Sequence, residues 1–169
     1  MWSDLIEEYG AGLSCPPADP AVLRRVEQTL GHSLPPDLGA LLLQTDGIEG
    51  PYGEGVVWPA EQILQNNRTF RADPEIRASY RPFDSLLFIG DNGGGDQFAL
   101  LWACGARERA GVHVWDHETD ERRRVARTWP AMCAGRWGAG ERTGTGSSGS
   151  ASEPRGRSHL CSAPADPEC

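Results

Sequence analysis

The sequence predicts an α+β domain in which N-terminal helices pack beside an antiparallel β-sheet. Residues 18–47 carry apolar side chains at helical spacing, and residues 85–126 hold four short apolar runs separated by turn residues. Beyond residue 130 large apolar residues become scarce, so the chain there cannot bury enough surface to offset the entropy of ordering. We therefore expect one folded domain over residues 1–130 and a low-complexity, disordered tail over residues 131–169.

The helices are placed by their apolar spacing and by their end signals. They are predicted over residues 2–9, 18–31, 33–47 and 59–70. The second has the clearest ends, because Asp19 can cap it, Pro20 suits the first helical position and Gly31 suits the left-handed position after the last turn.

Strands are expected mainly in the second half of the chain. A short strand over residues 55–59 ends at Pro59, since proline cannot donate to a β-ladder. The glycine-rich segment before it is interpreted as a loop, and residues 71–84 as irregular. The runs "SLLFIG", "QFALLWA", "GVHVWD" and "RRRVA" then predict an antiparallel meander.

The charge of the chain indicates the kind of partner it can bind. The formal net charge is −8, and the first 130 residues, with 20 acids and 12 arginines, account for all of it. Nucleic acid is therefore not expected as a partner, because phosphate contacts need a positive surface. An acidic surface keeps a protein soluble and can also attract a basic protein partner.

Composition also suggests where the protein works. There is no run of about 18 apolar residues, so no membrane span is expected. The acidic N-terminus lacks the pattern of a secretory signal, which favours a cytoplasmic location. The five cysteines form no CxxC pair, so we expect reduced thiols and neither a disulfide framework nor a zinc site.

The stretch "FIGDNGGGDQFAL", residues 88–100, has three consecutive glycines that could belong to a ligand loop. A phosphate cradle would lead into a helix, whereas these glycines lead into a predicted strand, and the chain has no lysine. Asp91 and Asp96 alone do not supply the alternating acids of a calcium loop. A tight turn is favoured, with the glycines at positive φ and Asp91 or Asn92 capping it.

A second stretch, "HVWDH", places His113, Asp116 and His117 close together and raises the possibility of a metal-dependent hydrolase. Because the strand passes into a turn, the side chains of the two histidines are not expected to point toward one metal site. The sequence shows no third cluster of ligands. Exposed strand and turn histidines are therefore favoured. The sequence also contains no motif of a catalytic nucleophile. We therefore predict no metal, no cofactor and no catalytic residue.

Taken in order, several blocks of the sequence resemble the SUKH superfamily, the Smi/Knr-type proteins named after yeast cell-wall assembly regulators. These blocks are "LGHSLPPDLGALLLQTDGIEG", "VVWPAEQILQNN", "LLFIGDNGGGDQFAL" and "VHVWDHETD". The resemblance covers residues 1–128 and implies a SUKH-like α+β domain with no enzymatic activity. Similar proteins continue into a final helix, whereas here residues 128–144 begin one and change into low complexity.

The resemblance also implies a function. Bacterial members of the superfamily are regarded as immunity proteins that bind and neutralise toxins, often nucleases. We accordingly expect a non-enzymatic protein that blocks a basic toxin domain. An alternative is an intracellular regulatory or scaffold protein of the same fold without a toxin; the sequence leaves the oligomeric state open. The acids expected to meet the partner lie in two loops and are Asp46, Glu49, Glu54, Asp91 and Asp96.

Overall fold

A computed structural model describes residues 15–50, 53–102 and 111–126. The predicted helix over residues 2–9 and the predicted tail over residues 131–169 lie outside these ranges. Within them the chain forms helices α2 (Pro20–Leu30), α3 (Pro36–Leu42), α4 (Ala60–Ala72) and α5 (Pro74–Ser79). The strands are β1 (Ile48–Glu49), β2 (Gly55–Val57), β3 (Leu86–Asp91), β4 (Gln97–Leu101), β5 (Val112–Trp115) and β6 (Arg122–Ala126).

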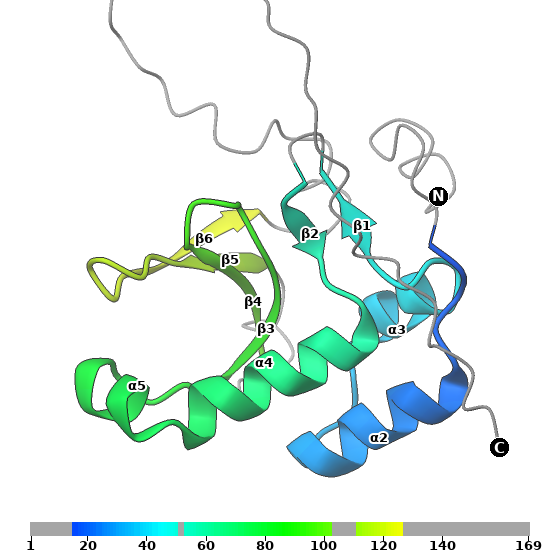
Figure 1. The fold of residues 1–169 in the computed structure, drawn as a ribbon, viewed down its shortest axis with the longest axis horizontal. Coiled ribbons are helices and arrows are strands. Elements are labelled where there is room, and N and C mark those ends of the chain that lie inside the picture. The colour runs from blue at the N-terminus through cyan, green and yellow to red at the C-terminus, as the bar shows by residue number, and fades with distance from the viewer. Residues whose placement is uncertain (1–14, 51–52, 103–110, 127–169) are drawn as a thin grey trace, which may run out of the picture.

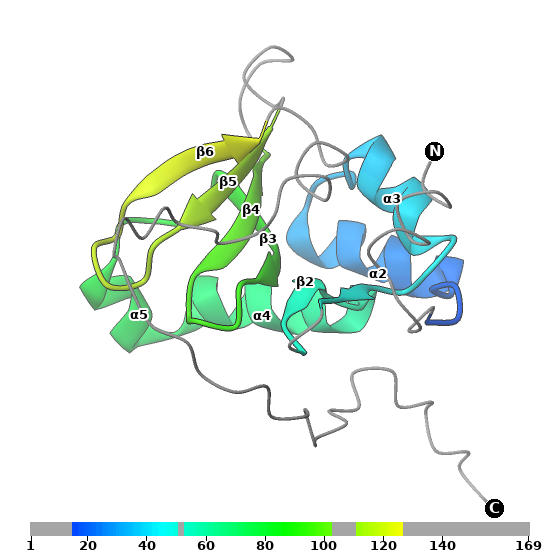
Figure 2. The ribbon, with the colours of Figure 1, turned by 90° about the horizontal axis from the view of Figure 1, so that it is seen from above.

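The architecture confirms the predicted α+β class. Strands β3 to β6 form a four-stranded antiparallel meander in sequence order, and β1 pairs with β2 in a separate two-stranded ribbon. Helix α4 runs along β3, and α2 packs against α4, as Figures 1 and 2 show. No helix in the described part of the chain is long and apolar enough to cross a membrane.

Helix α2 begins and ends as its sequence predicts. The Asp19 carboxylate accepts a hydrogen bond from the amide of Ala21, and Pro20 occupies the first helical position. Gly31 ends the helix with φ = +79°, in the left-handed region where glycine has no Cβ penalty. The helix buries Leu23 and Val26 against the core.

Two local expectations were wrong. Residues 74–79, which were expected to be irregular, form α5, because Asp73 caps the amides of Glu75 and Ile76 and Pro74 takes the first helical position. The glycine-rich loop before β2 contains the short strand β1, which the expected turn residues concealed.

The free edge of β3 is completed by side chains from α4. Fully buried Asn67 donates to the carbonyls of Ile63 and Phe88 and accepts from the amide of Phe88. One turn later, Arg71 donates to the carbonyl of Leu86. These bonds satisfy backbone groups that would otherwise be buried without a partner, so α4 acts here in place of a further strand.

Further along the same edge of β3, the edge is covered by β2 and the residue that follows it. The amide of Trp58 donates to the carbonyl of Ile89 at 2.7 Å. A Cβ added at Gly90 would lie 2.1 Å from the carbonyl oxygen of Val56, so only glycine allows this close approach of the two backbones.

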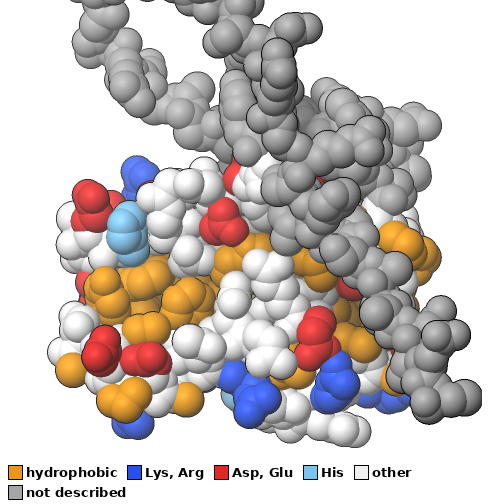
Figure 3. Space-filling model, viewed as in Figure 1, with side chains coloured by type: hydrophobic (Ala, Val, Ile, Leu, Met, Phe, Trp, Pro, Cys, Tyr) orange, Lys and Arg blue, Asp and Glu red, His pale blue; other side chains and the backbone are white. Residues whose placement is uncertain are grey.

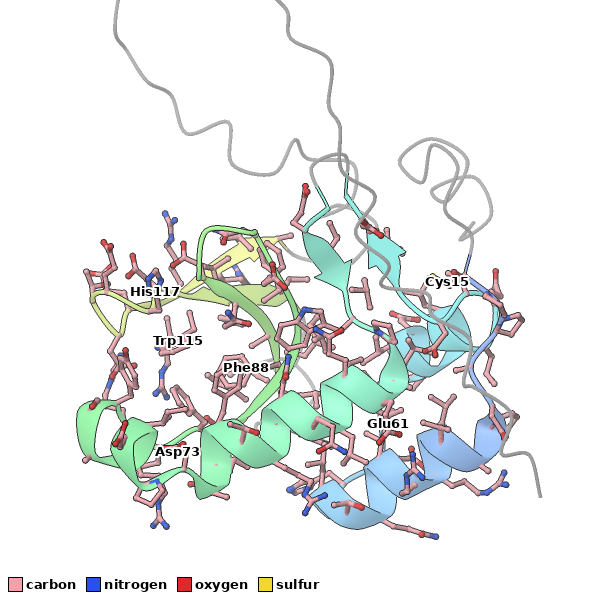
Figure 4. All side chains as sticks on the ribbon, in the orientation of Figure 1. Cys15, Glu61, Asp73, Phe88, Trp115 and His117 are labelled. Atoms are coloured by element: carbon pink, nitrogen blue, oxygen red, sulfur yellow. The ribbon has the colours of Figure 1, made fainter. Side chains whose placement is uncertain are left out.

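An aromatic cluster fills the space between α4, α5 and the sheet. Its members are Phe70, Tyr80, Phe83, Phe88 and Trp115, with ring centroids 4.8–6.2 Å apart and mostly edge-on geometry. Figure 4 labels Phe88 and Trp115 within it. On β5 both Val114 and Trp115 are buried although successive side chains point to opposite faces, so the sheet is covered on both sides.

The prediction of reduced thiols was wrong for Cys15. This residue is buried and disulfide-bonded. The other four cysteines lie outside the described residues. The absence of a CxxC pair did not reveal this bond, because a disulfide can join cysteines that are far apart in the sequence.

Candidate functional site

Three turns meet at one end of the sheet and bring most of the predicted acids together. The β1–β2 turn meets the β3–β4 turn, because a Cβ on Gly93 would lie 3.3 Å from the Cβ of Glu54. The β3–β4 turn meets the β5–β6 turn through Asp96 Oδ1 and His117 Nδ1, which are 3.0 Å apart. We call Glu49, Glu54 and residues 91–96 and 116–121 the acidic end. Acidic side chains are visible along this edge in Figure 3.

The glycine motif forms the middle of the acidic end, and the structure confirms that it is a turn. Asp91 Oδ1 accepts from the amide of Gly93, and Asn92 Oδ1 accepts from the amide of Gly94. Gly93 and Gly95 have φ of +72° and +104°, whereas Gly94 does not have a positive φ. Strand β4 follows directly, so the loop does not lead into a helix that could bind phosphate.

The β5–β6 turn of the acidic end is held by hydrogen bonds to its own side chains. Asp116 Oδ1 accepts from the amides of Thr119 and Glu118, and these bonds lower the pKa of Asp116. Asp120 has φ = +56°, a conformation that aspartate tolerates better than most residues. The turn is thus held by its own side chains and does not depend on glycine.

Asp120 ties this turn to the segment after α5. Its Oδ2 accepts from the backbone amide and the Nε of Arg81, and its Oδ1 accepts from the indole of Trp115 at 2.9 Å. Burial alone would raise the pKa of Asp120, but the bonds from Arg81 and Trp115 and the charge of Arg122 outweigh it and lower this pKa to about 2. Asp120 is therefore ionised across the physiological range.

Asp46, Asp91 and Asp96, three of the predicted docking acids, accept hydrogen bonds from identified donors. Asp46 Oδ1 accepts from the amide of Ala60 and so caps α4 from the open end of the β1–β2 ribbon, away from the acidic end. Asp91 Oδ2 accepts from the indole of buried Trp58 at 2.6 Å. Asp96 accepts from the side chain of Asn92 and contacts His117.

The other two predicted acids belong to the β1–β2 ribbon. Glu49 lies opposite Gly55 in the ladder, and Glu54 packs over Gly50, where an added Cβ would lie 2.2 Å from its Oε1. Both side chains are half-buried. The structure therefore brings four predicted acids to one end of the sheet and leaves Asp46 apart from them.

The most accessible acids of this end were not predicted from the sequence. Glu118 and Glu121 are exposed, and their carboxylates make no hydrogen bond or ion pair with any residue that the structure describes. The signal was present in "DHETDE", where four acids fall in six residues. The sequence does not show that these acids join those of residues 91–96, because it does not reveal that turns two strands apart meet in space.

The three residues considered for a metal do not converge. His113 lies within β5 opposite Ala99, and burial, followed by the charge of Arg124, lowers its pKa. Asp116 holds the turn backbone, while His117 faces Asp96. Over residues 15–50, 53–102 and 111–126, no group of three or more His, Cys, Asp or Glu side chains has a geometry that could hold a metal ion.

These features define an α+β domain with an acid-rich surface at the turns of an antiparallel meander. The chain belongs to the SMI1 / KNR4 family (SUKH-1), whose model matches residues 17–135. Proteins of this family are generally non-enzymatic and of the immunity type. No curated protein matches the sequence.

Proposed function

We propose that this protein is an immunity protein that neutralises a toxin, such as a nuclease, by binding its basic domain through the acidic end. The observation that carries the proposal is the gathering of eight carboxylates at one end of the sheet in a chain of this family. They are Glu49, Glu54, Asp91, Asp96, Asp116, Glu118, Asp120 and Glu121. Binding without catalysis is sufficient, because occluding the active site of a toxin stops its chemistry.

The charge balance of this surface supports a cationic partner. Within the described ranges, Arg81 and Arg122 form ion pairs with the acidic end, and both bind Asp120. Asp91, Asp116, Glu118 and Glu121 form no ion pair with any residue that the structure describes. A nuclease domain carries positive charge to hold nucleic acid, so the two surfaces attract each other over a distance and associate quickly.

The internal bonds of these acids also favour rapid, specific binding. Asp91, Asp96 and Asp116 are fixed by hydrogen bonds to neighbouring groups, so little conformational entropy is lost when a partner docks. Glu118 and Glu121 then supply the exposed carboxylates that can pair directly with lysine or arginine. We therefore expect the fixed acids to attract the partner through their electrostatic field and the exposed acids to contact it directly.

The test is protection of cells from any toxin domain that is found to be encoded beside the gene for this protein. Host cells would express that domain alone, or with this protein, and survival would be counted. We expect this protein to restore growth. Glu118→Lys and Glu121→Lys should each weaken protection, because each places a positive charge on the docking surface.

Asp37→Lys is the matched control, since it makes the same charge change at an exposed position on α3. It should protect as well as the wild-type protein does. If no toxin domain is encoded nearby and the protein rescues no cells, the proposal is wrong, and the regulatory or scaffold alternative is then preferred.

A further inference from the structure

A hollow of about 420 Å³ lies beside α5, and none of its lining residues belongs to the acidic end. Its walls come from the end of α4, from α5 and from the segment after α5. The residues that give it its character are Phe70, Ile76, Tyr80 and Phe83 on the apolar side and Arg77 and Arg81 on the charged side. Its volume lies within the range of ligand-binding pockets.

The floor of the hollow is part of the aromatic cluster. The rings of Phe70 and Tyr80 each contact Phe83, with centroids 6.1 and 6.2 Å away. Phe83 is buried, but Phe70, Ile76 and Tyr80 are only half-buried. Helix α5 has no buried residue, so it does not close over this apolar surface.

Arginine dominates the charged side of the hollow. Arg71 is held by the carbonyl of Leu86, and Arg81 is held by Asp120. The guanidinium of Arg77, exposed in the last turn of α5, makes no hydrogen bond or ion pair within the described ranges. Among the described lining residues Asp84 is the one acid, so Arg71 and Arg77 leave a net positive charge even though Arg81 is paired with Asp120.

We propose that this hollow binds an acidic peptide segment of a partner protein through an aromatic side chain. An aromatic ring can pack edge-on against Phe70 and Tyr80, while a neighbouring carboxylate pairs with Arg77. A basic segment would be repelled by the same arginines. The inference goes beyond the proposed immunity function, because the acidic end takes a cationic surface and this hollow takes an anionic one.

The experiment uses the full-length protein and three fluorescein-labelled peptides with the centres Asp-Phe-Asp, Asp-Ala-Asp and Lys-Phe-Lys. Binding is followed by fluorescence polarisation. The Asp-Phe-Asp peptide should bind about tenfold more tightly than either of the others, since only it supplies both the ring and the charge. No binding of this peptide, or equal binding of all three, contradicts the proposal.

Variants locate the binding. Arg77→Glu and Ile76→Asp should each weaken the affinity for the Asp-Phe-Asp peptide at least about fivefold, because each places an anion in the hollow. Arg24→Glu, an exposed position on α2, is the matched control and should leave the affinity unchanged. Circular dichroism checks that every variant is folded. Affinity that Arg77→Glu does not alter would place the peptide elsewhere and overturn the proposal.

A further variant separates this proposal from the proposed function. Glu121→Lys should leave the affinity for the peptide unchanged although it weakens protection against the toxin. A clear change of peptide affinity in this variant, in either direction, would mean that the peptide binds at the acidic end, and the hollow would then not be the site.

Discussion

At the scale of single residues, several acids of this protein serve the fold before they can serve a partner. The sequence marked Asp46, Asp91 and Asp96 as docking residues because they lie in loops of an acidic chain. In the structure each accepts a hydrogen bond from a specific donor on another segment. Such long-range partners are invisible in the sequence, where only nearest neighbours along the chain can be assessed.

Two substitutions of Asp46 distinguish its role as a cap of α4 from the effect of its negative charge. Burial raises its pKa, the bond from Ala60 lowers it and Glu61 raises it again, with a net increase. We therefore expect Asp46→Asn, which keeps the accepting oxygen without the charge, to be at least as stable as the wild-type protein at pH 7. Asp46→Ala should lose about 1 kcal/mol of unfolding free energy because α4 loses its cap. Urea denaturation of both variants tests this; equal losses would show that the charge itself is required.

Asp120 is expected to make stability depend on acid pH. Its pKa is lowered to about 2 in the folded protein from a usual value of 3.8. A lowered pKa means that the ionised form stabilises the fold, so this contribution is complete above pH 3.8 and is lost as the pH falls through 2. Asp120→Asn should therefore cost about 1 kcal/mol at pH 7, after allowing for solvent screening, and progressively less between pH 4 and pH 2. Denaturation curves across that range measure the difference, and a constant difference would contradict the assignment.

At the scale of elements, the sheet is completed by a helix. The periodicity of residues 60–72 predicts the helix itself, but it does not predict that Asn67 and Arg71 satisfy the backbone of β3. The sequence alone does not distinguish the two adjacent asparagines in "LQNNR", Asn66 and Asn67. Only the packing of α4 on β3 buries one and leaves the other half-buried.

This difference gives a matched pair of variants. Asn67→Ala should destabilise the protein by about 2–4 kcal/mol, because it removes three buried hydrogen bonds and leaves the amide and carbonyl of Phe88 without a partner. Asn66→Ala, one residue earlier, should change stability by less than about 0.5 kcal/mol. Thermal denaturation compares them directly. Similar melting temperatures for the two variants would show that α4 does not complete the sheet edge.

The three consecutive glycines are expected to differ in how much stability is lost when each is replaced by alanine. A Cβ at Gly95 would lie 2.6 Å from the His117 ring at a φ of +104°, whereas a Cβ at Gly94 would meet only the Asn92 side chain, 3.3 Å away. Gly95→Ala should therefore cost about 1–3 kcal/mol, and Gly94→Ala much less. Adding His117→Ala to Gly95→Ala should recover part of the loss by removing the contact but not the backbone strain. Denaturation midpoints of the three variants test this, and equal costs for both glycines would contradict the geometry.

The elements themselves could largely be predicted, and their failures have physical causes. Helix α2, the four strands of the meander and the glycine turn follow from periodicity and end signals that are local in the sequence. Helix α5 was missed because its six residues are too few to show a period and bury nothing. The β1 strand was missed because two residues between turn formers carry no strand signal.

At the scale of the whole molecule, the candidate site depends on topology. In a meander, every second turn lies at the same end of the sheet, so the acids of residues 91–96 and 116–121 are brought together although about 20 residues of chain separate them. The sequence supplied the acids and the family resemblance, but not this convergence. It accordingly identified four docking acids of the acidic end and missed the other four, Asp116, Glu118, Asp120 and Glu121.

The most direct test of the central claim is the salt dependence of toxin binding. The dissociation constant between this protein and any toxin domain found to be encoded beside its gene would be measured by titration calorimetry from low to high NaCl, for the wild-type protein and for Glu121→Lys. We expect affinity to fall steadily as salt is added, with a shallower dependence for Glu121→Lys, because exposed charges are screened. Affinity that is indifferent to ionic strength, and equal in the two proteins, would show that the acidic end does not bind the partner.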